Sequence, residues 1–433
     1  MSPAARRRAG PLAAALALLL LPLASRGEPP LAPNPWLERR VLHGAHGAGY
    51  REEPENTVYA MKKAVQRGAD LLEMDLRISS DGEIMVIHDT TVNRNTNGTG
   101  FVHEKTVAEL TQLDAAYDFS PASNTVNGAL AGTLPYRGIG LGSAPPPPGY
   151  TRSDFTIPTL AQVLATFPDV LLDMEIKEDG PPELHAATAK RLAELLHAFG
   201  RSNDVLVTSF SDELLASFKT LAPEMGTSPG TNETAEFFFY QTPMPHHVAL
   251  QVPREYFGLN LVNKTVMANA RNAGLAFIVF VYDDDEFEPV YARIVDAGAQ
   301  GMLVGVPSLF ERMLEERGVV FRSPVSVSRP RVTAWLGALE LDVACPAEQV
   351  ARCQGDVLVD APGLYVGRGR VDLARGASGT VRIALSYPAR LALLRNAAIG
   401  ATVRVTPRNG STAGSATPIA VPRPVSPSGA PAF

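Results

Sequence analysis

The sequence of 433 residues is poor in cysteine, has no excess of positive charge and has few long apolar runs. Its two cysteines, Cys345 and Cys353, have no histidine near them, which excludes a four-ligand zinc site there. The 39 basic residues against 45 acidic ones give a formal net charge of −6, so the chain is a poor candidate for binding nucleic acid. The apolar run from Pro11 to Leu23 is too short to span a bilayer comfortably.

Residues 1–26 have the order of a secretory signal peptide. Arg6-Arg7-Arg8 precedes the apolar run, and the small residues Ala24 and Ser25 follow it. The segment contains four arginines and no acidic residue, so its removal would leave a net charge of −10. We therefore expect a secreted or periplasmic protein with no stable membrane span after cleavage. The alternative is an uncleaved membrane anchor.

Strand-like and helix-like patterns alternate between residues 38 and 316. Runs that predict β-strands lie at 38–46, 69–76, 84–88, 170–177, 205–209, 248–250, 276–281 and 301–304. An amphipathic stretch from Thr57 to Gly68 predicts a helix after the first of them, and helical patterns separate several others. This alternation predicts an α/β fold, a (β/α)₈ TIM barrel, with functional residues at the carboxyl ends of its strands.

Other segments interrupt or follow the predicted barrel. Residues 115–155, rich in Ala, Ser, Gly and Pro, predict an insertion over the catalytic face, which either shapes the substrate site or has no function. Residues 325–406 show period-two alternation between Gly/Pro turns, which predicts a small all-β, sandwich-like domain. We expect residues 407–433 to be disordered. Export favours a disulfide between Cys345 and Cys353, with two unpaired thiols as the alternative.

No motif in the predicted β domain indicates what it does. It has no catalytic constellation and no recognisable partner site. Accessory binding and a purely stabilising role both stay open.

Polar residues on the predicted barrel strands form a pattern of their own. Glu73 and Asp75 are two residues apart in an apolar run, so a strand places both carboxylates on one face. Burying two carboxylates together without a cation is costly, and hard oxygen ligands suit Ca²⁺ or Mg²⁺. His46 ends the first apolar run and His88 ends the third. The pattern predicts a metal-assisted acid–base site, for which phosphoester hydrolysis is the natural chemistry.

Five short motifs occur in order between residues 54 and 177. They are Pro54-Glu55-Asn56-Thr57, Glu73-Met74-Asp75, His88-Asp89, Arg94-Asn95-Thr96 and Asp173-Met174-Glu175-Ile176-Lys177. In this order they resemble the glycerophosphodiester phosphodiesterase family, and the likeness covers about residues 41–314. The family's first histidine usually lies eight residues before the proline, a spacing that His46 satisfies and His43 does not. The arginine that follows it in the family is Gly47 here, and Arg51 is our candidate for the missing charge.

The resemblance implies one divalent cation, Ca²⁺ or Mg²⁺, held by three carboxylates. They are those of Glu73, Asp75 and Glu175. Lys177 would contact the phosphate, and Arg94 would either contact it too or only form a turn. His46 and His88 would be the catalytic acid and base, in an order that the sequence does not give.

We therefore expect an exported, metal-dependent hydrolase that cleaves glycerophosphodiesters to glycerol phosphate and an alcohol. Its substrate would be a small glycerophosphodiester or a lysophospholipid-type molecule, with a head group that the sequence does not specify. One alternative is a phospholipase D-like lipid phosphodiesterase on the same barrel. Another is a catalytically weak surface-binding protein, which the glycine at position 47 favours and the retained acidic cluster disfavours.

Overall fold

The computed structural model describes most of the chain from residue 41 onward. The described residues are 34, 36–37, 41–121, 133–168, 170–202, 204–256, 258–317, 326–333, 337–345, 353–374, 377–407 and 415–423. The predicted signal peptide at residues 1–26 lies outside them. Within the described residues, no helix combines the length and the hydropathy that crossing a bilayer requires.

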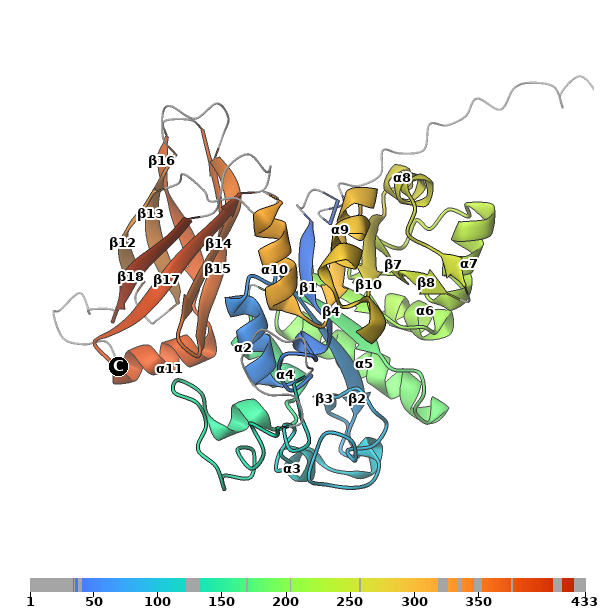
Figure 1. Ribbon diagram of the computed structural model, residues 1–433. Helices are drawn as coiled ribbons and strands as arrows, with labels where there is room; N and C mark the ends of the chain where they lie inside the picture. The colour runs from blue at the N-terminus through green and yellow to red at the C-terminus, as the bar shows by residue number, and fades with distance from the viewer. Residues whose placement is uncertain are drawn as a thin grey trace, which may run out of the picture. The chain divides into compact units, whose positions relative to one another are not determined.

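Eight parallel strands form a nearly closed barrel (Figure 1). They are β1 (Leu42–Ala45), β2 (Leu71–Ile78), β4 (Leu171–Ile176), β5 (Val205–Thr208), β6 (Gly226–Thr227), β7 (Ala249–Pro253), β10 (Ala276–Phe280) and β11 (Gly301–Val304). They are hydrogen-bonded in the order β6-β5-β4-β2-β1-β11-β10-β7. Across the remaining gap, the backbone N of Val248 donates to the carbonyl of Thr227 at 2.9 Å. The predicted TIM barrel is confirmed.

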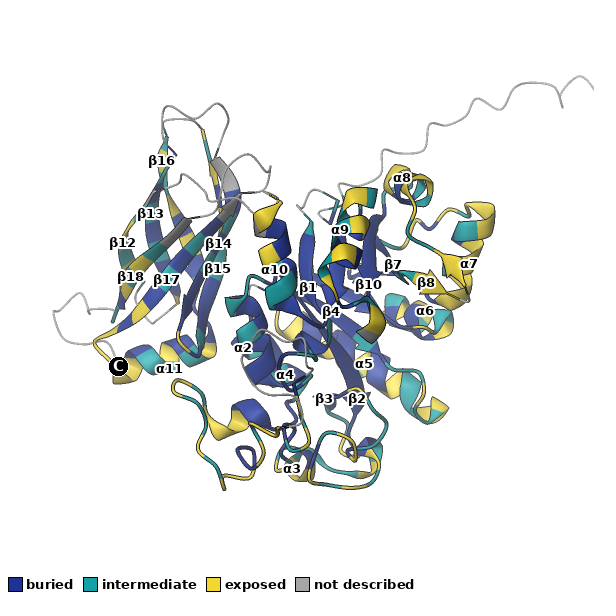
Figure 2. Ribbon diagram, viewed as in Figure 1, coloured by how far each residue is buried: buried dark blue, intermediate teal, exposed yellow. Residues whose placement is uncertain are grey.

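Helices connect the strands and cover the outside of the barrel. They are α2 (Val58–Gln66), α3 (Val107–Leu110), α4 (Leu160–Thr166), α5 (His185–Ala198), α6 (Asp212–Leu221), α7 (Thr231–Tyr240), α8 (Lys264–Asn272), α9 (Glu288–Ala297) and α10 (Pro307–Glu316). Helix α2 begins where Thr57 accepts a hydrogen bond from the backbone N of Ala60 at 3.1 Å. Figure 2 shows the buried barrel strands inside helices whose outer faces are exposed.

One of the eight predicted strands is not a barrel strand. Strand β3 (Ile84–Val86) pairs antiparallel with β2, beside the barrel path. The missing barrel strand is β6, whose two residues are too few to give a hydrophobic pattern in the sequence. His88 therefore reaches the site from the connection that follows β3.

Two antiparallel sheets follow the barrel. One contains β12 (Ser326–Val332), β13 (Ala338–Ala344) and β16 (Ser378–Ala384). The other contains β14 (Cys353–Ala361), β15 (Leu364–Leu373), β17 (Ala398–Pro407) and β18 (Ser415–Pro422), and α11 (Tyr387–Arg395) joins β16 to β17. Leu339 and Ile383 from the first sheet share one apolar cluster with Val357 and Val403 from the second. The two sheets therefore pack as a small sandwich.

Strand β18 lies inside residues 407–433, which we expected to be disordered, and it is ordered because it pairs along β17 from Ala398 to Val405. Cys345 is disulfide-bonded. The side chain of Cys353, its expected partner, lies outside the described residues.

The insertion, described over residues 115–121 and 133–155, packs against α2. The ring of Phe155 stacks on Tyr59 at a centroid distance of 4.4 Å, and Lys62 Nζ lies 2.7 Å from Asp154 Oδ1. None of its described residues lines the cavity at the carboxyl ends of the barrel strands. Its expected position over the catalytic face stays a prediction.

Candidate active site

Three residue pairs lie side by side on the neighbouring parallel strands β2 and β4. They are Leu71 with Leu171, Glu73 with Asp173, and Asp75 with Glu175. Because successive side chains on a strand point to opposite faces, these alternate residues share the barrel interior. The residues between them, such as Met74 and Met174, pack in the apolar cluster under the helices. The period of the strands thus places two layers of carboxylates above an apolar floor.

Three carboxylates of these layers gather at one point. Oxygen atoms of Glu73, Asp75 and Glu175 all lie within 4.8 Å of one another. Lys177, just beyond the end of β4, places its Nζ 3.3 Å from Asp75 Oδ1 and 2.9 Å from Glu175 Oε1. One ammonium group therefore pairs with two of the three carboxylates of the cluster.

Burial and neighbouring charges together shift the pKa values of the cluster. Burial, and then the charge of Asp75, raise the pKa of Glu73 well above its ordinary value. Burial likewise raises the pKa of Glu175 to about 7, although Lys177 opposes the shift. Burial acts in the same direction on Asp75, but Lys177 and then His88 outweigh it, so the pKa of Asp75 falls below its ordinary value. Burial also raises the pKa of Asp173 to about 8.

The loop after β1 holds two of these carboxylates from above. Asn56 donates from Nδ2 to Asp75 Oδ2 at 2.7 Å, and its Oδ1 accepts the backbone N–H of Asp75 at 3.2 Å. The backbone N–H of Gly47 donates to Glu73 Oε2. Gly47 has a φ of 51°, and a Cβ built there would lie 3.4 Å from Tyr50 Cβ. A side chain would therefore fit at position 47, at the cost of a left-handed backbone conformation.

Two histidines face the cavity in opposite electrostatic environments. His46 Nδ1 lies 3.2 Å from the carbonyl oxygen of Val281, and burial lowers the pKa of His46 below 6.5. His88 Nδ1 lies 2.8 Å from Asp89 Oδ1, and this hydrogen bond raises the pKa of His88 above 6.5. His43 instead lies buried 3.0 Å from Glu311 Oε2. His46 therefore lines the cavity, whereas His43 does not.

The two arginines that we expected at the phosphate do not line the cavity. Arg94 Nε lies 2.8 Å from Asp89 Oδ2, and its Nη2 donates to Glu55 Oε1. The backbone N–H of Arg51 donates to the carbonyl of Gly305 at 3.1 Å. Neither arginine is among the described residues that line the cavity. Arg94 therefore holds Asp89, which in turn orients His88, and its direct phosphate contact stays a prediction.

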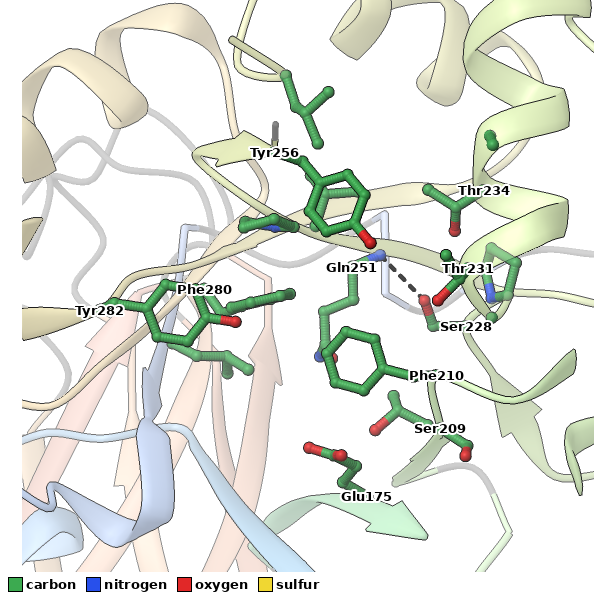
Figure 3. Close-up of a pocket in the computed structure, with 18 of the residues that line it drawn as sticks. Glu175, Ser209, Phe210, Ser228, Thr231, Thr234, Gln251, Tyr256, Phe280 and Tyr282 are labelled. Atoms are coloured by element: carbon green, nitrogen blue, oxygen red, sulfur yellow. Dashed lines mark hydrogen bonds between the residues drawn. The ribbon is translucent and has the colours of Figure 1, made fainter. Parts of the chain in front are cut away.

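The acidic cluster, Lys177 and the two histidines line one cavity of about 390 Å³. His46, His88 and the acidic cluster with Lys177 form one end of it. The other end is formed mainly by residues 208–210 and 228–261, including α7 and the short hairpin of β8 (Glu255–Tyr256) and β9 (Leu259–Asn260) (Figure 3). The sequence reasoning missed this second end. The aromatic run Phe237-Phe238-Phe239-Tyr240 was a signal that could have revealed it.

Comparisons with known proteins show the family of this chain. The sequence pattern of the glycerophosphoryl diester phosphodiesterase family matches residues 43–308, which is more than half of the chain. The chain belongs to this family. The match includes the whole carboxylate cluster, both cavity histidines and Lys177, and it ends before the two antiparallel sheets.

Two relatives named as glycerophosphodiester phosphodiesterases match nearly two thirds of this chain. A glycerophosphodiester phosphodiesterase of Caldanaerobacter subterraneus subsp. tengcongensis is 26% identical over 64% of this chain and 100% of the relative. A Bacillus subtilis glycerophosphodiester phosphodiesterase is 26% identical over 63% of this chain and 86% of its own. Among solved structures, an Oleispira antarctica phosphodiesterase in complex with sn-glycerol-3-phosphate is 21% identical to this chain, with a TM-score of 0.45. The match covers 64% of this chain and 96% of that structure's chain.

Proposed function

We propose that this protein hydrolyses glycerophosphodiesters to glycerol phosphate and an alcohol with the help of one divalent cation. The observation that carries the proposal is the convergence, in one cavity, of a carboxylate cluster, a lysine and two histidines of opposite pKa shift. Membership of the glycerophosphoryl diester phosphodiesterase family supports the same reaction.

The donor set fits a hard cation. Glu73, Asp75 and Glu175 offer only oxygen ligands, and burial raises the pKa values of Glu73 and Glu175, which a bound cation would counteract by stabilising their charged forms. Mg²⁺ and Ca²⁺ both suit such a set. Once bound, the cation would stabilise the negative charge that develops on the phosphoryl oxygens.

The remaining groups supply binding and proton transfer. Lys177 Nζ, which lies at the acidic cluster, attracts an anionic oxygen of the phosphodiester. At neutral pH the lowered pKa leaves His46 unprotonated, and with Nδ1 held by the carbonyl of Val281, its Nε2 accepts a proton from the attacking oxygen. That oxygen belongs to water or to a neighbouring glycerol hydroxyl.

His88 completes the transfer on the other side of the phosphorus. Its raised pKa favours the protonated form, because Asp89 accepts a hydrogen bond from Nδ1 and Arg94 holds Asp89 in place. His88 then donates a proton to the departing alcohol. The opposite pKa shifts of the two histidines thus support assigning His46 as the base and His88 as the acid.

Export of the protein is a separate proposal that rests on the sequence alone. It follows from the arginine-rich and apolar order of residues 1–26. Amino-terminal sequencing of the mature protein tests it, and an intact amino terminus would contradict it.

Release of glycerol phosphate from glycerophosphocholine tests the proposed reaction. Purified protein is assayed with chelator and again after Mg²⁺ or Ca²⁺ is restored, beside His88→Ala and the control His197→Ala. His197 is an exposed histidine that pairs with Glu224 on the outside of the barrel. We expect no turnover in chelator, a loss of about 10²–10⁴-fold in His88→Ala and wild-type rates in His197→Ala. Near-normal activity of His88→Ala, or full activity in chelator, would contradict the assignment.

A further inference from the structure

The end of the cavity opposite the acidic cluster is open to solvent and mainly apolar, although hydroxyl groups such as those of Ser228, Thr231 and Thr234 also line it. Among the described residues, 14 large hydrophobic side chains are exposed, and five of them line this single cavity. They are Phe210, Phe239, Tyr256, Leu259 and Tyr282, with exposed fractions between 43% and 69%. We call these five residues the apolar wall. Their gathering at one site indicates a surface built to be covered by a ligand.

The apolar wall is continuous with the catalytic end of the cavity. The ring of Phe280 lies 6.3 Å from His46 by centroids, 6.4 Å from Phe210 and 5.4 Å from Tyr282. In Figure 3, the rings of Phe210, Tyr256 and Tyr282 come from three different segments and point into the cavity that also holds Glu175. A ligand whose phosphodiester lies at Lys177 can therefore extend along the wall without leaving the cavity.

The chemistry of the wall favours a hydrocarbon occupant. Among the residues that line the cavity, the carboxylates are those of Glu73, Asp75 and Glu175, which all lie in the acidic cluster. The wall itself offers aromatic faces and one leucine, with no carboxylate of its own to neutralise a cationic head group. A small glycerophosphodiester held at Lys177 would leave the wall exposed to water, whereas a hydrocarbon chain would cover it.

We propose that the apolar wall binds the single hydrocarbon chain of a lysophospholipid-type substrate, so that the enzyme cleaves monoacyl glycerophosphodiesters. This inference rests on the proposed function. The bond between phosphorus and the head-group oxygen breaks, and a bond from phosphorus to the attacking oxygen forms. The proton of the attacking oxygen passes to His46, and the head-group oxygen receives a proton from His88. With water as the attacking group, the products are a monoacylglycerol phosphate and the free head-group alcohol.

The first test is the dependence of kcat/KM on chain length. Butanoyl, hexanoyl, octanoyl and decanoyl lysophosphatidylcholines are compared with chain-free glycerophosphocholine, all below their micelle-forming concentrations. We expect kcat/KM to rise by up to about fourfold for each methylene that the wall buries, and then to reach a plateau. A value independent of chain length, or a rise that occurs only above the micelle-forming concentration, would overturn the proposal.

Two neighbouring residues on α7 provide a matched pair of variants. Phe239 lines the cavity, whereas Tyr240, the next residue and the more exposed one, does not. In Phe239→Ser the ratio of kcat/KM for the decanoyl substrate to that for the chain-free one should fall about tenfold, while Tyr240→Ser should keep the wild-type ratio. Equal loss in both variants would indicate docking of the outer surface on lipid aggregates, and would refute binding of the chain inside the cavity.

The same variants test the rival occupant, a quaternary ammonium group stacked on the aromatic rings. If the effect of Phe239→Ser depends on the change from choline to ethanolamine head groups and not on chain length, the chain proposal fails.

A binding experiment separates this inference from the proposed function. Alkyl phosphonates of increasing length, which are not hydrolysed, should raise the melting temperature of the wild type in proportion to length, and less in Phe239→Ser. Length-dependent stabilisation without any turnover of glycerophosphocholine would reject the proposed reaction but keep the chain-binding site. Turnover of glycerophosphocholine without length-dependent stabilisation would reject the chain-binding site alone.

Discussion

Replacing Glu175 by glutamine should stabilise the metal-free protein and destroy its function. Burial raises the pKa of Glu175 to about 7 from an ordinary value of 4.5. Between these two pH values the folded protein holds a proton that the unfolded chain releases, so this group lowers stability as the pH rises. The full shift corresponds to about 3 kcal/mol. Glutamine has no charge to desolvate, so above pH 7 and without cation we expect Glu175→Gln to regain up to about that amount.

Thermal unfolding with and without cation measures both parts of this prediction. In chelator above pH 7, Glu175→Gln should melt about 5 °C higher than the wild type, and the difference should vanish near pH 4.5. Addition of Mg²⁺ or Ca²⁺ should raise the melting temperature of the wild type but not that of the variant, which should also lose turnover. The control Glu194→Gln removes an exposed carboxylate on α5 and should match the wild type. A lower melting temperature for Glu175→Gln in chelator, or a cation response of wild-type size, would refute the reasoning.

Three further predictions concern the acid–base groups and the glycine that replaces the family arginine. The lowered pKa of His46 and the raised pKa of His88 should give a bell-shaped pH profile of kcat/KM with one limb below pH 6.5 and one above it, and a single limb would contradict the paired roles. Asp89→Asn removes the main cause of the raised pKa of His88, so the alkaline limb should move toward pH 6.5, and an unmoved limb would show that Asp89 does not act through His88. Gly47→Arg places a side chain at a φ of 51°, which should cost about 1–2 kcal/mol of stability. If an arginine at position 47 contacts the phosphate, the same variant should also lower KM for glycerophosphocholine. An unchanged KM would show that an arginine at this position makes no such contact.

The sequence predicted the barrel well because seven of its strands are visible as apolar runs. It failed at β6, whose Gly226 and Thr227 give no hydrophobic pattern, and it counted β3 in its place. The residues of β3 look like a barrel strand because Met85 and Val86 are buried, although the strand lies outside the barrel. A buried strand has the same apolar sequence pattern whether it lies in the barrel or beside it.

The acidic cluster could be predicted because it depends on local geometry. Glu73 and Asp75 share a face through the period of a single strand, and Glu175 repeats the pattern on its neighbour in matching register. The apolar wall could not be predicted in this way. It combines Phe210 after β5, Phe239 on α7 and Tyr282 after β10, and no local period relates positions so far apart in the chain.

The chemistry of the site was thus determined by the sequence, since the type and the alternation of residues on two strands fix which charged groups enter the barrel. Tertiary structure alone decided what those groups contact. It placed Arg94 on Asp89 and Glu55, away from the cavity, and it gave His46 and His88 pKa shifts of opposite direction. Both outcomes depend on burial and on charges supplied by distant segments. These are properties of the folded chain, and no short sequence segment determines them.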